Sequence, residues 1–74
     1  MTYSFTMHDG RTCTKTSKRS APPAFAVCVT ARDGSAGYAA TASTRTLADA
    51  AARRFANPSW GFSKVTVEPV TVVA

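Results

Sequence analysis

The fold is decided by residues 25–43, whose sequence is FAVCVTARDGSAGYAATAS. Residues 25–32 alternate with the period of a β-strand, so that Phe25, Val27, Val29 and Ala31 share one face and Ala26, Cys28, Thr30 and Arg32 share the other. Asp33-Gly34 accommodates the positive φ angles of a tight turn, and residues 37–43 run back with Tyr and Ala on a common face. This stretch therefore predicts a β-hairpin at the centre of a sheet.

A second hairpin is predicted on the N-terminal side of this stretch. Residues 2–7 alternate strictly, so their aromatic side chains share one face of a half-buried strand. Asp9-Gly10 has turn chemistry, and residues 11–16 return as an edge strand because few of their side chains are apolar. Residues 17–24 contain two adjacent prolines, which lack the N–H groups that a ladder needs, so we expect a mobile basic loop there.

One amphipathic helix is expected after these hairpins. Thr46 and Asp49 have the spacing of a capping box, which predicts that the helix begins at Leu47. Asp49 and Arg53 are spaced to form an i,i+4 ion pair, and Pro58 follows the end of the helix. The broad apolar stripe that faces the sheet is expected to contain Leu47, Ala51 and Phe55, flanked by Ala48, Ala52 and Ala56.

The C-terminal part predicts a last strand after an aromatic corner. At the corner, Trp60 is expected to fill the space between helix and sheet, whereas an exposed Trp60 would be an interface anchor. Residues 64–68 alternate as a fifth strand, and Pro69 indicates an edge position or a bulge. Residues 70–73 form an apolar terminal strand whose open edge invites pairing with a second copy, so we expect a homodimer.

These elements predict an α+β fold in a single domain over residues 1–74, with one antiparallel sheet of four to five strands and the helix packed on one face. A chain of 74 residues is too short for a two-domain enzyme. It begins without the basic and apolar segments of a secretory signal, and no apolar run approaches the roughly 18 residues of a membrane span. We therefore expect a cytoplasmic protein that does not cross a membrane.

The residues that could carry chemistry do not form a recognisable catalytic or metal site. His8 is the only histidine, and because it adjoins a turn we expect it to be solvated. Each of the four acidic residues has a local role in a turn, at the helix start or on a strand face. Cys13, Cys28 and His8 lack the spacing of a zinc module, and two cysteines in a reducing compartment predict free thiols. We expect no enzyme activity, no metal and no cofactor.

Positive charge is the distinctive chemical feature. Nine Lys and Arg against four Asp and Glu give a net charge of +5, which favours polyanions or acidic protein surfaces. Alternation places Arg11 and Lys15 on one face of a strand, where they could track a phosphate backbone. A solvated surface that keeps a small domain soluble is the other interpretation. The candidate partner-binding residues are Arg11, Lys15, Lys18, Arg19, Arg45, Arg53, Arg54 and Trp60.

Two resemblances to known families bear on function. The hairpin with its Asp33-Gly34 turn, followed by Ser43 and an alanine-rich helix, resembles the second half of a double-stranded-RNA-binding domain, which implies contact with nucleic acid. The order of elements over most of the chain, with the Trp60-Gly61 corner before the last strand, is similar to small phage-encoded anti-CRISPR proteins. That resemblance implies a stoichiometric inhibitor that docks on a host CRISPR-Cas surveillance complex and blocks target DNA.

Two hypotheses follow for the function of this chain. The main one is a small non-enzymatic inhibitor or adaptor that works by protein–protein contact, and the net charge of +5 implies an acidic or mixed protein surface rather than mimicry of DNA. The alternative is a nucleic-acid-binding accessory domain that uses the basic strand and loop. The two differ in salt dependence, because phosphate contacts weaken steeply as salt rises.

Overall fold

A computed structural model describes residues 1–18 and 22–73 of the chain. Within these residues the elements follow the predicted order of two hairpins, a helix and a C-terminal strand, so the α+β class is confirmed. The elements are β1 (Thr2–Thr6), β2 (Thr12–Thr16), β3 (Phe25–Ala31), β4 (Ala36–Ala42), α1 (Arg45–Phe55), the 3-10 helix η1 (Pro58–Trp60), β5 (Phe62–Pro69) and β6 (Thr71–Val72).

The described strands form two antiparallel three-stranded sheets, with orders β2-β1-β6 and β4-β3-β5, and not the single sheet of four to five strands that the sequence predicts. The chain passes from one sheet to the other just after Pro69, the last residue of β5. Val70 still donates its N–H to the carbonyl of Ala24, and Val72 then lies opposite Tyr3 in β1. The proline interruption therefore marks a crossing between sheets, and β5 is an edge strand as predicted.

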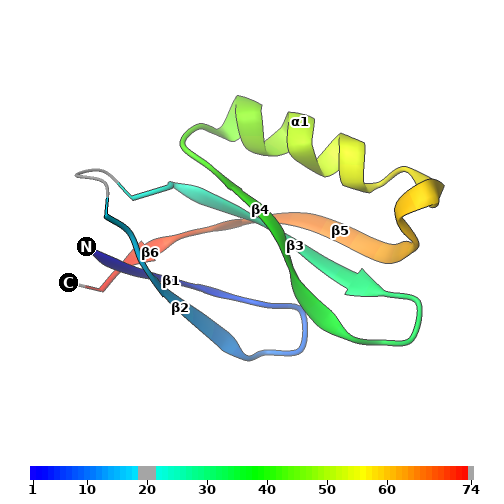
Figure 1. The fold of residues 1–74 in the computed structure, drawn as a ribbon, viewed down its shortest axis with the longest axis horizontal. Helices are drawn as coiled ribbons and strands as arrows, with labels where there is room; N and C mark the ends of the chain where they lie inside the picture. The colour runs from blue at the N-terminus through cyan, green and yellow to red at the C-terminus, as the bar shows by residue number, and fades with distance from the viewer. Residues whose placement is uncertain (19–21, 74) are drawn as a thin grey trace.

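Three layers result, with β3 in the middle one (Figure 1). The helix α1 contacts β3, β4 and β5 on one side of their sheet, and the sheet of β1 lies on the other side. Because side chains alternate along a strand, β3 supplies both interfaces. Ala26 and Cys28 pack against Tyr3 and Phe5 of β1, and the fully buried Val27 faces the helix.

The helix begins two residues earlier than the capping-box pattern predicts. Thr44 is the N-cap, and its hydroxyl oxygen accepts the N–H of Leu47 at 3.2 Å. Asp49 pairs with Arg45, at 3.3 Å, and not with Arg53. Both differences from the prediction have one cause. Strand β4 ends at Ala42, so the helix can start at Arg45, and Thr46 already lies inside its first turn.

The buried face of α1 lies within the predicted stripe but is centred on Ala48, and it leaves Leu47 and Ala56 exposed. Ala48 is fully buried, with Ala51, Ala52 and Phe55 partly buried around it, whereas 56% of Leu47 is exposed. Because Ala48 is small, the helix axis can lie close to the sheet at this point. The larger Leu47 does not fit between helix and sheet at that distance and lies on the flank of α1. Among the described residues, no helix has the length and hydropathy that crossing a membrane requires.

Candidate partner-binding surface

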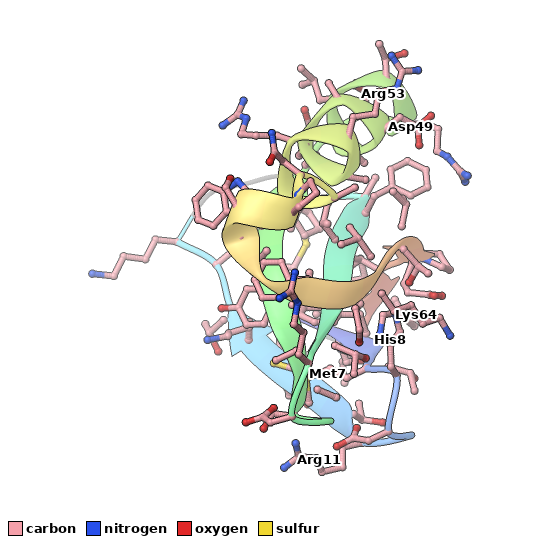
Figure 2. The ribbon with its side chains drawn as sticks, turned by 90° about the vertical axis from the view of Figure 1, so that its right-hand side faces the viewer. Met7, His8, Arg11, Asp49, Arg53 and Lys64 are labelled. Atoms are coloured by element: carbon pink, nitrogen blue, oxygen red, sulfur yellow. The ribbon has the colours of Figure 1, made fainter. Side chains whose placement is uncertain are left out.

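The predicted basic residues do not gather into one patch. Arg11 precedes β2 in the β1–β2 turn and forms an ion pair with Asp9. Arg45 pairs with Asp49 at the start of α1, and its guanidinium lies 5.7 Å from the centre of the Phe25 ring. Figure 2 shows Arg11 at one end of the molecule and Arg53 at the other. Arg11 and Arg53 therefore do not belong to one basic patch.

Lys15 lies on the inner side of its sheet, which corrects the prediction of a phosphate-tracking strand face. It lies opposite Tyr3, and Cys13 lies opposite Phe5, so both share the face that packs on the other sheet. The ammonium group lies 5.1 Å from the centre of the Tyr38 ring on β4. A hydrogen bond with the Tyr38 side chain raises the pKa of Lys15, so the lysine stays charged at neutral pH.

The neighbouring Arg53 and Arg54 lie on different flanks of α1. Arg54 follows Leu47 by seven residues, or about two helical turns, so it shares the flank of Leu47, while Arg53 is about 120° away. Arg53 instead follows Asp49 by one turn, and Figure 2 shows the two close together. Lys18 follows β2 and is exposed, and Arg19 lies outside the described residues, as does much of the predicted mobile loop.

Trp60 does not fill the space between helix and sheet. It is 51% exposed and meets the Phe55 ring edge-on, with the ring centres 4.9 Å apart. Phe55 also contacts Phe62, at the start of β5, so Phe55 occupies the position expected of the tryptophan. Gly61 has a φ of 75°, a left-handed conformation that glycine adopts at low cost, and it turns the chain from η1 into β5.

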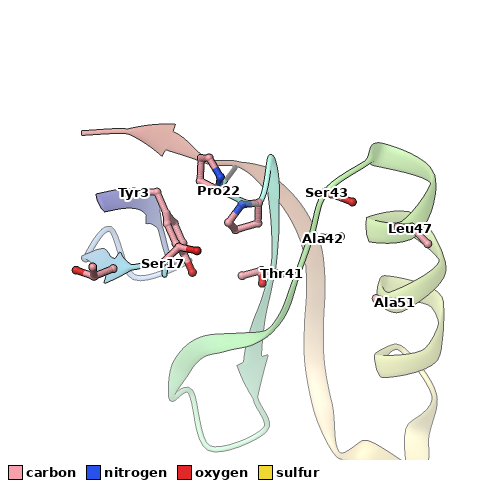
Figure 3. Close-up of a pocket in the computed structure, with 10 residues that line it drawn as sticks. Tyr3, Ser17, Pro22, Thr41, Ala42, Ser43, Leu47 and Ala51 are labelled. Carbon is pink, nitrogen blue, oxygen red and sulfur yellow. The ribbon is translucent and has the colours of Figure 1, made fainter. Parts of the chain in front are cut away.

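A groove that the sequence does not predict lies between the two sheets and the first half of α1 (Figure 3). It has a volume of about 1070 Å³, and its walls combine apolar side chains with hydroxyl groups. No lining residue in the described part of the chain is charged. The groove is lined by Tyr3, Thr16, Ser17, Pro22, Pro23, Thr41, Ala42, Ser43, Leu47 and Ala51.

Three basic residues adjoin the residues that line the groove. Lys15 and Lys18 flank the lining residues Thr16 and Ser17 along the chain, and Arg54 lies one turn beyond Ala51 on the same flank of α1. The acidic residues lie elsewhere in the described structure. Asp9 and Asp33 belong to the two hairpin turns, Asp49 is on the far flank of α1, and Glu68 accepts a hydrogen bond from Thr66 on β5.

No known protein family matches the sequence, and no curated protein or solved structure shows significant similarity to it. The geometry of the chain therefore carries the functional argument. Within residues 1–18 and 22–73, no group of three or more His, Cys, Asp and Glu side chains could hold a metal ion. Both cysteines are free thiols, and burial raises the pKa of Cys28 to about 11, so this thiol is protonated at neutral pH.

His8 is not a solvated turn residue. Its Nδ1 lies 2.6 Å from the hydroxyl of Thr30 on β3, and its Nε2 lies 2.6 Å from the hydroxyl of Thr66 on β5. The β1–β2 turn is thereby joined to the opposite sheet. A single histidine held by two threonines serves the fold, because both ring nitrogens already have partners.

The groove is the feature that sequence reasoning missed. Leu47 is the one local signal of the groove. The alanines beside it allow the closest approach of α1 to the sheet, so the larger leucine is left at the flank of the helix. The other lining residues come from the open end of the β1–β2 hairpin, from the segment before β3, from the end of β4 and the residue after it, and from α1. Their meeting depends on the division into two sheets, which no local pattern indicates.

Proposed function

We propose that this chain is a non-enzymatic protein-binding module whose groove receives an acidic segment of a partner protein. The observation that supports the proposal is the combination of an uncharged, partly apolar groove with a rim of Lys15, Lys18 and Arg54. An apolar floor supplies affinity by desolvation, and a cationic rim selects and steers an acidic partner.

The partner that the anti-CRISPR resemblance suggests is a host CRISPR-Cas surveillance complex. On this proposal the chain acts in the host cytoplasm as an inhibitor from a phage or another mobile element. It docks on an acidic protein surface of the complex and keeps target DNA from binding. The net charge of +5 supports a protein surface as the target, since a mimic of DNA would be acidic.

A nucleic-acid-binding accessory domain is the second candidate. The exposed Trp60 favours it, because an exposed aromatic ring can stack on a base, and the net charge of +5 attracts phosphates. The distribution of the cations favours the protein partner. Arg11 and Arg45 each form an ion pair with an acidic residue of the chain itself, so neither is left to track a phosphate backbone.

The first prediction compares Arg54→Glu with Arg53→Glu, two identical charge changes at adjacent exposed positions. Binding is measured by biolayer interferometry against a panel of purified CRISPR-Cas surveillance complexes. We expect sub-micromolar binding that Arg54→Glu weakens by about tenfold or more, with a change within about twofold for Arg53→Glu. Unfolding midpoints of both variants serve as the control for folding.

Salt dependence separates the two candidate functions. Binding to a surveillance complex is expected to persist when salt is raised from about 50 to 200 mM, because a desolvated groove carries the affinity. Plain duplex and single-stranded DNA are the comparison ligands in a mobility-shift titration. Tight binding to either of them that falls by orders of magnitude over this range would contradict the protein-directed proposal and favour the nucleic-acid one.

A further inference from the structure

The open edges of the two described sheets differ in how they are protected. Edge strands expose unpaired N–H and C=O groups, and proteins usually protect them with charges, proline or short length. The edge strand β2 carries Lys15, and β5 carries Lys64, Glu68 and Pro69. The edge strand β6 has only two residues. Among the described edges, β4 alone has none of these devices.

Strand β4 has seven residues, Ala36–Ala42, and every side chain in it is uncharged and, except for Tyr38, small. It pairs with β3 on one side only. Its pairing shifts register opposite Val27 and Cys28, which divides the strand into two halves. The half nearer the helix contains Thr41 and Ala42, and both line the groove. The groove and the unprotected edge are therefore one continuous surface.

We propose that the partner segment binds in an extended conformation as a strand added to the edge of β4, with acidic side chains directed to the groove rim. This inference rests on the proposed function and specifies how the groove is used. Backbone hydrogen bonds to β4 supply affinity that depends little on sequence, and side chains that enter the groove supply selectivity. The sheet β4-β3-β5 would gain a fourth strand.

The charge around β4 favours a segment of another protein over a second copy of this chain. Lys15 reaches the Tyr38 ring of β4, Lys18 adjoins the groove-lining Ser17 in the chain, and Arg54 shares the helix flank of Leu47 and Ala51. The acidic residues of the described structure lie in the two hairpin turns, on the far flank of α1 and on β5. Pairing two β4 edges would bring these like charges together, in a chain that already carries a net charge of +5. An acidic strand instead meets opposite charge at this edge.

The probe is a fluorescein-labelled peptide of eight residues in which Val and Glu alternate, and binding is measured by fluorescence anisotropy. Successive N–H groups of an extended strand point to opposite sides, so an added strand uses only every second one. Two further peptides carry N-methyl groups on all the Val amides or on all the Glu amides. We expect one methylated peptide to lose at least about tenfold in affinity and the other to stay within about threefold. A Val-Lys peptide is expected not to bind.

Amide hydrogen exchange locates the site on the protein. With the Val-Glu peptide bound, we expect slower exchange in β4, whereas the edge strand β5 serves as the internal control and should not change. Equal affinity of the two methylated peptides and the unmodified one would overturn strand addition. An equal loss of affinity by both methylated peptides would also overturn it, because it would indicate a segment that bridges β2 and β4. Slow exchange of β4 in a dimer without peptide would overturn it in favour of a second copy.

The outcome is separable from that of the proposed function. If none of the peptides binds, while Arg54→Glu still weakens binding to a surveillance complex, strand addition is wrong and the protein-binding function stands. If the peptide binds as a strand but no surveillance complex binds, the strand mode stands and the proposed partner is wrong. If neither binds, both proposals are wrong.

Discussion

At the scale of single residues, His8 shows how one side chain connects the two sheets. Thr66 donates its hydroxyl proton to the Glu68 carboxylate, at 3.0 Å. The oxygen of that hydroxyl is then free to accept from His8, so Nε2 carries the proton. In neutral His8 the other nitrogen, Nδ1, has a lone pair and accepts the hydroxyl proton of Thr30. One chain of hydrogen bonds thus passes from β3 through the β1–β2 turn to β5.

This arrangement predicts both a tautomer and a stability effect. In ¹⁵N NMR spectra of the neutral side chain, we expect a protonated Nε2 and an unprotonated Nδ1. His8→Phe should lower the free energy of unfolding by about 1–3 kcal/mol, because the Thr30 hydroxyl loses its partner. Adding Thr30→Val should recover part of that loss, since an apolar pair leaves no unsatisfied group. Unchanged denaturant stability of His8→Phe would contradict the assignment.

Residue roles were the least predictable part of the sequence. The acidic residues in turns were correctly interpreted, because Asp33 needs only the N–H of Ser35, two residues away. That hydrogen bond lowers the pKa of Asp33. His8 and Leu47 were misassigned because their environments come from strands distant in sequence. Local patterns report short-range partners well and long-range ones poorly.

At the scale of elements, the hairpins were predicted closely and the start of the helix was not. Hairpin turns are set by local chemistry: Gly10 and Gly34 have φ angles of 87° and 91°, as their Asp-Gly turns require. The helix start was ambiguous because Thr44 and Thr46 are both good N-cap residues. The end of β4 decides between them, and that position depends on the pairing with β3.

The two threonines give a matched pair of variants. Thr44→Ala should lower the free energy of unfolding by about 1 kcal/mol, because the N–H of Leu47 loses its acceptor. Thr46→Ala lies inside the helix and is exposed, so it should have no cost or a small gain from the higher helix propensity of alanine. Urea denaturation of both variants measures the difference. A larger loss for Thr46→Ala would show that the capping box forms instead.

At the scale of the whole molecule, the division into two sheets was beyond local reasoning. The sequence predicts that β5 is interrupted at Pro69, but not that the chain then joins β1, nearly seventy residues earlier. The groove exists only because of that division, so it could not be predicted either. The role of the predicted partner-binding cations stays a prediction. Lys15, Lys18 and Arg54 adjoin groove-lining residues, whereas Arg11 and Arg45 form ion pairs elsewhere and Arg53 lies on another flank of α1.

The homodimer expected from the C-terminal strand remains a prediction at this scale. Val72 and Val73 are 52% and 59% exposed at the open edge of β6, and pairing with a second copy would cover them. Sedimentation equilibrium at micromolar concentrations should therefore give the mass of a dimer. Val72→Lys should give a folded monomer, with a lower unfolding midpoint than the dimer, because association no longer stabilises the folded state. A monomeric unsubstituted chain would contradict this prediction.

The pairing of β1 with β6 also affects the order in which the chain folds. Tyr3 lies opposite Val72, and Val73 donates its N–H to the carbonyl of Thr2, so the first strand is flanked by the last. Closing so long a loop is entropically expensive and slows folding. The hairpin β3–β4, whose partners are close in sequence, can form early. The hairpin β1–β2 is equally local, so we expect only the pairing of β6 with β1 to form last, when the end of the chain arrives beside its beginning.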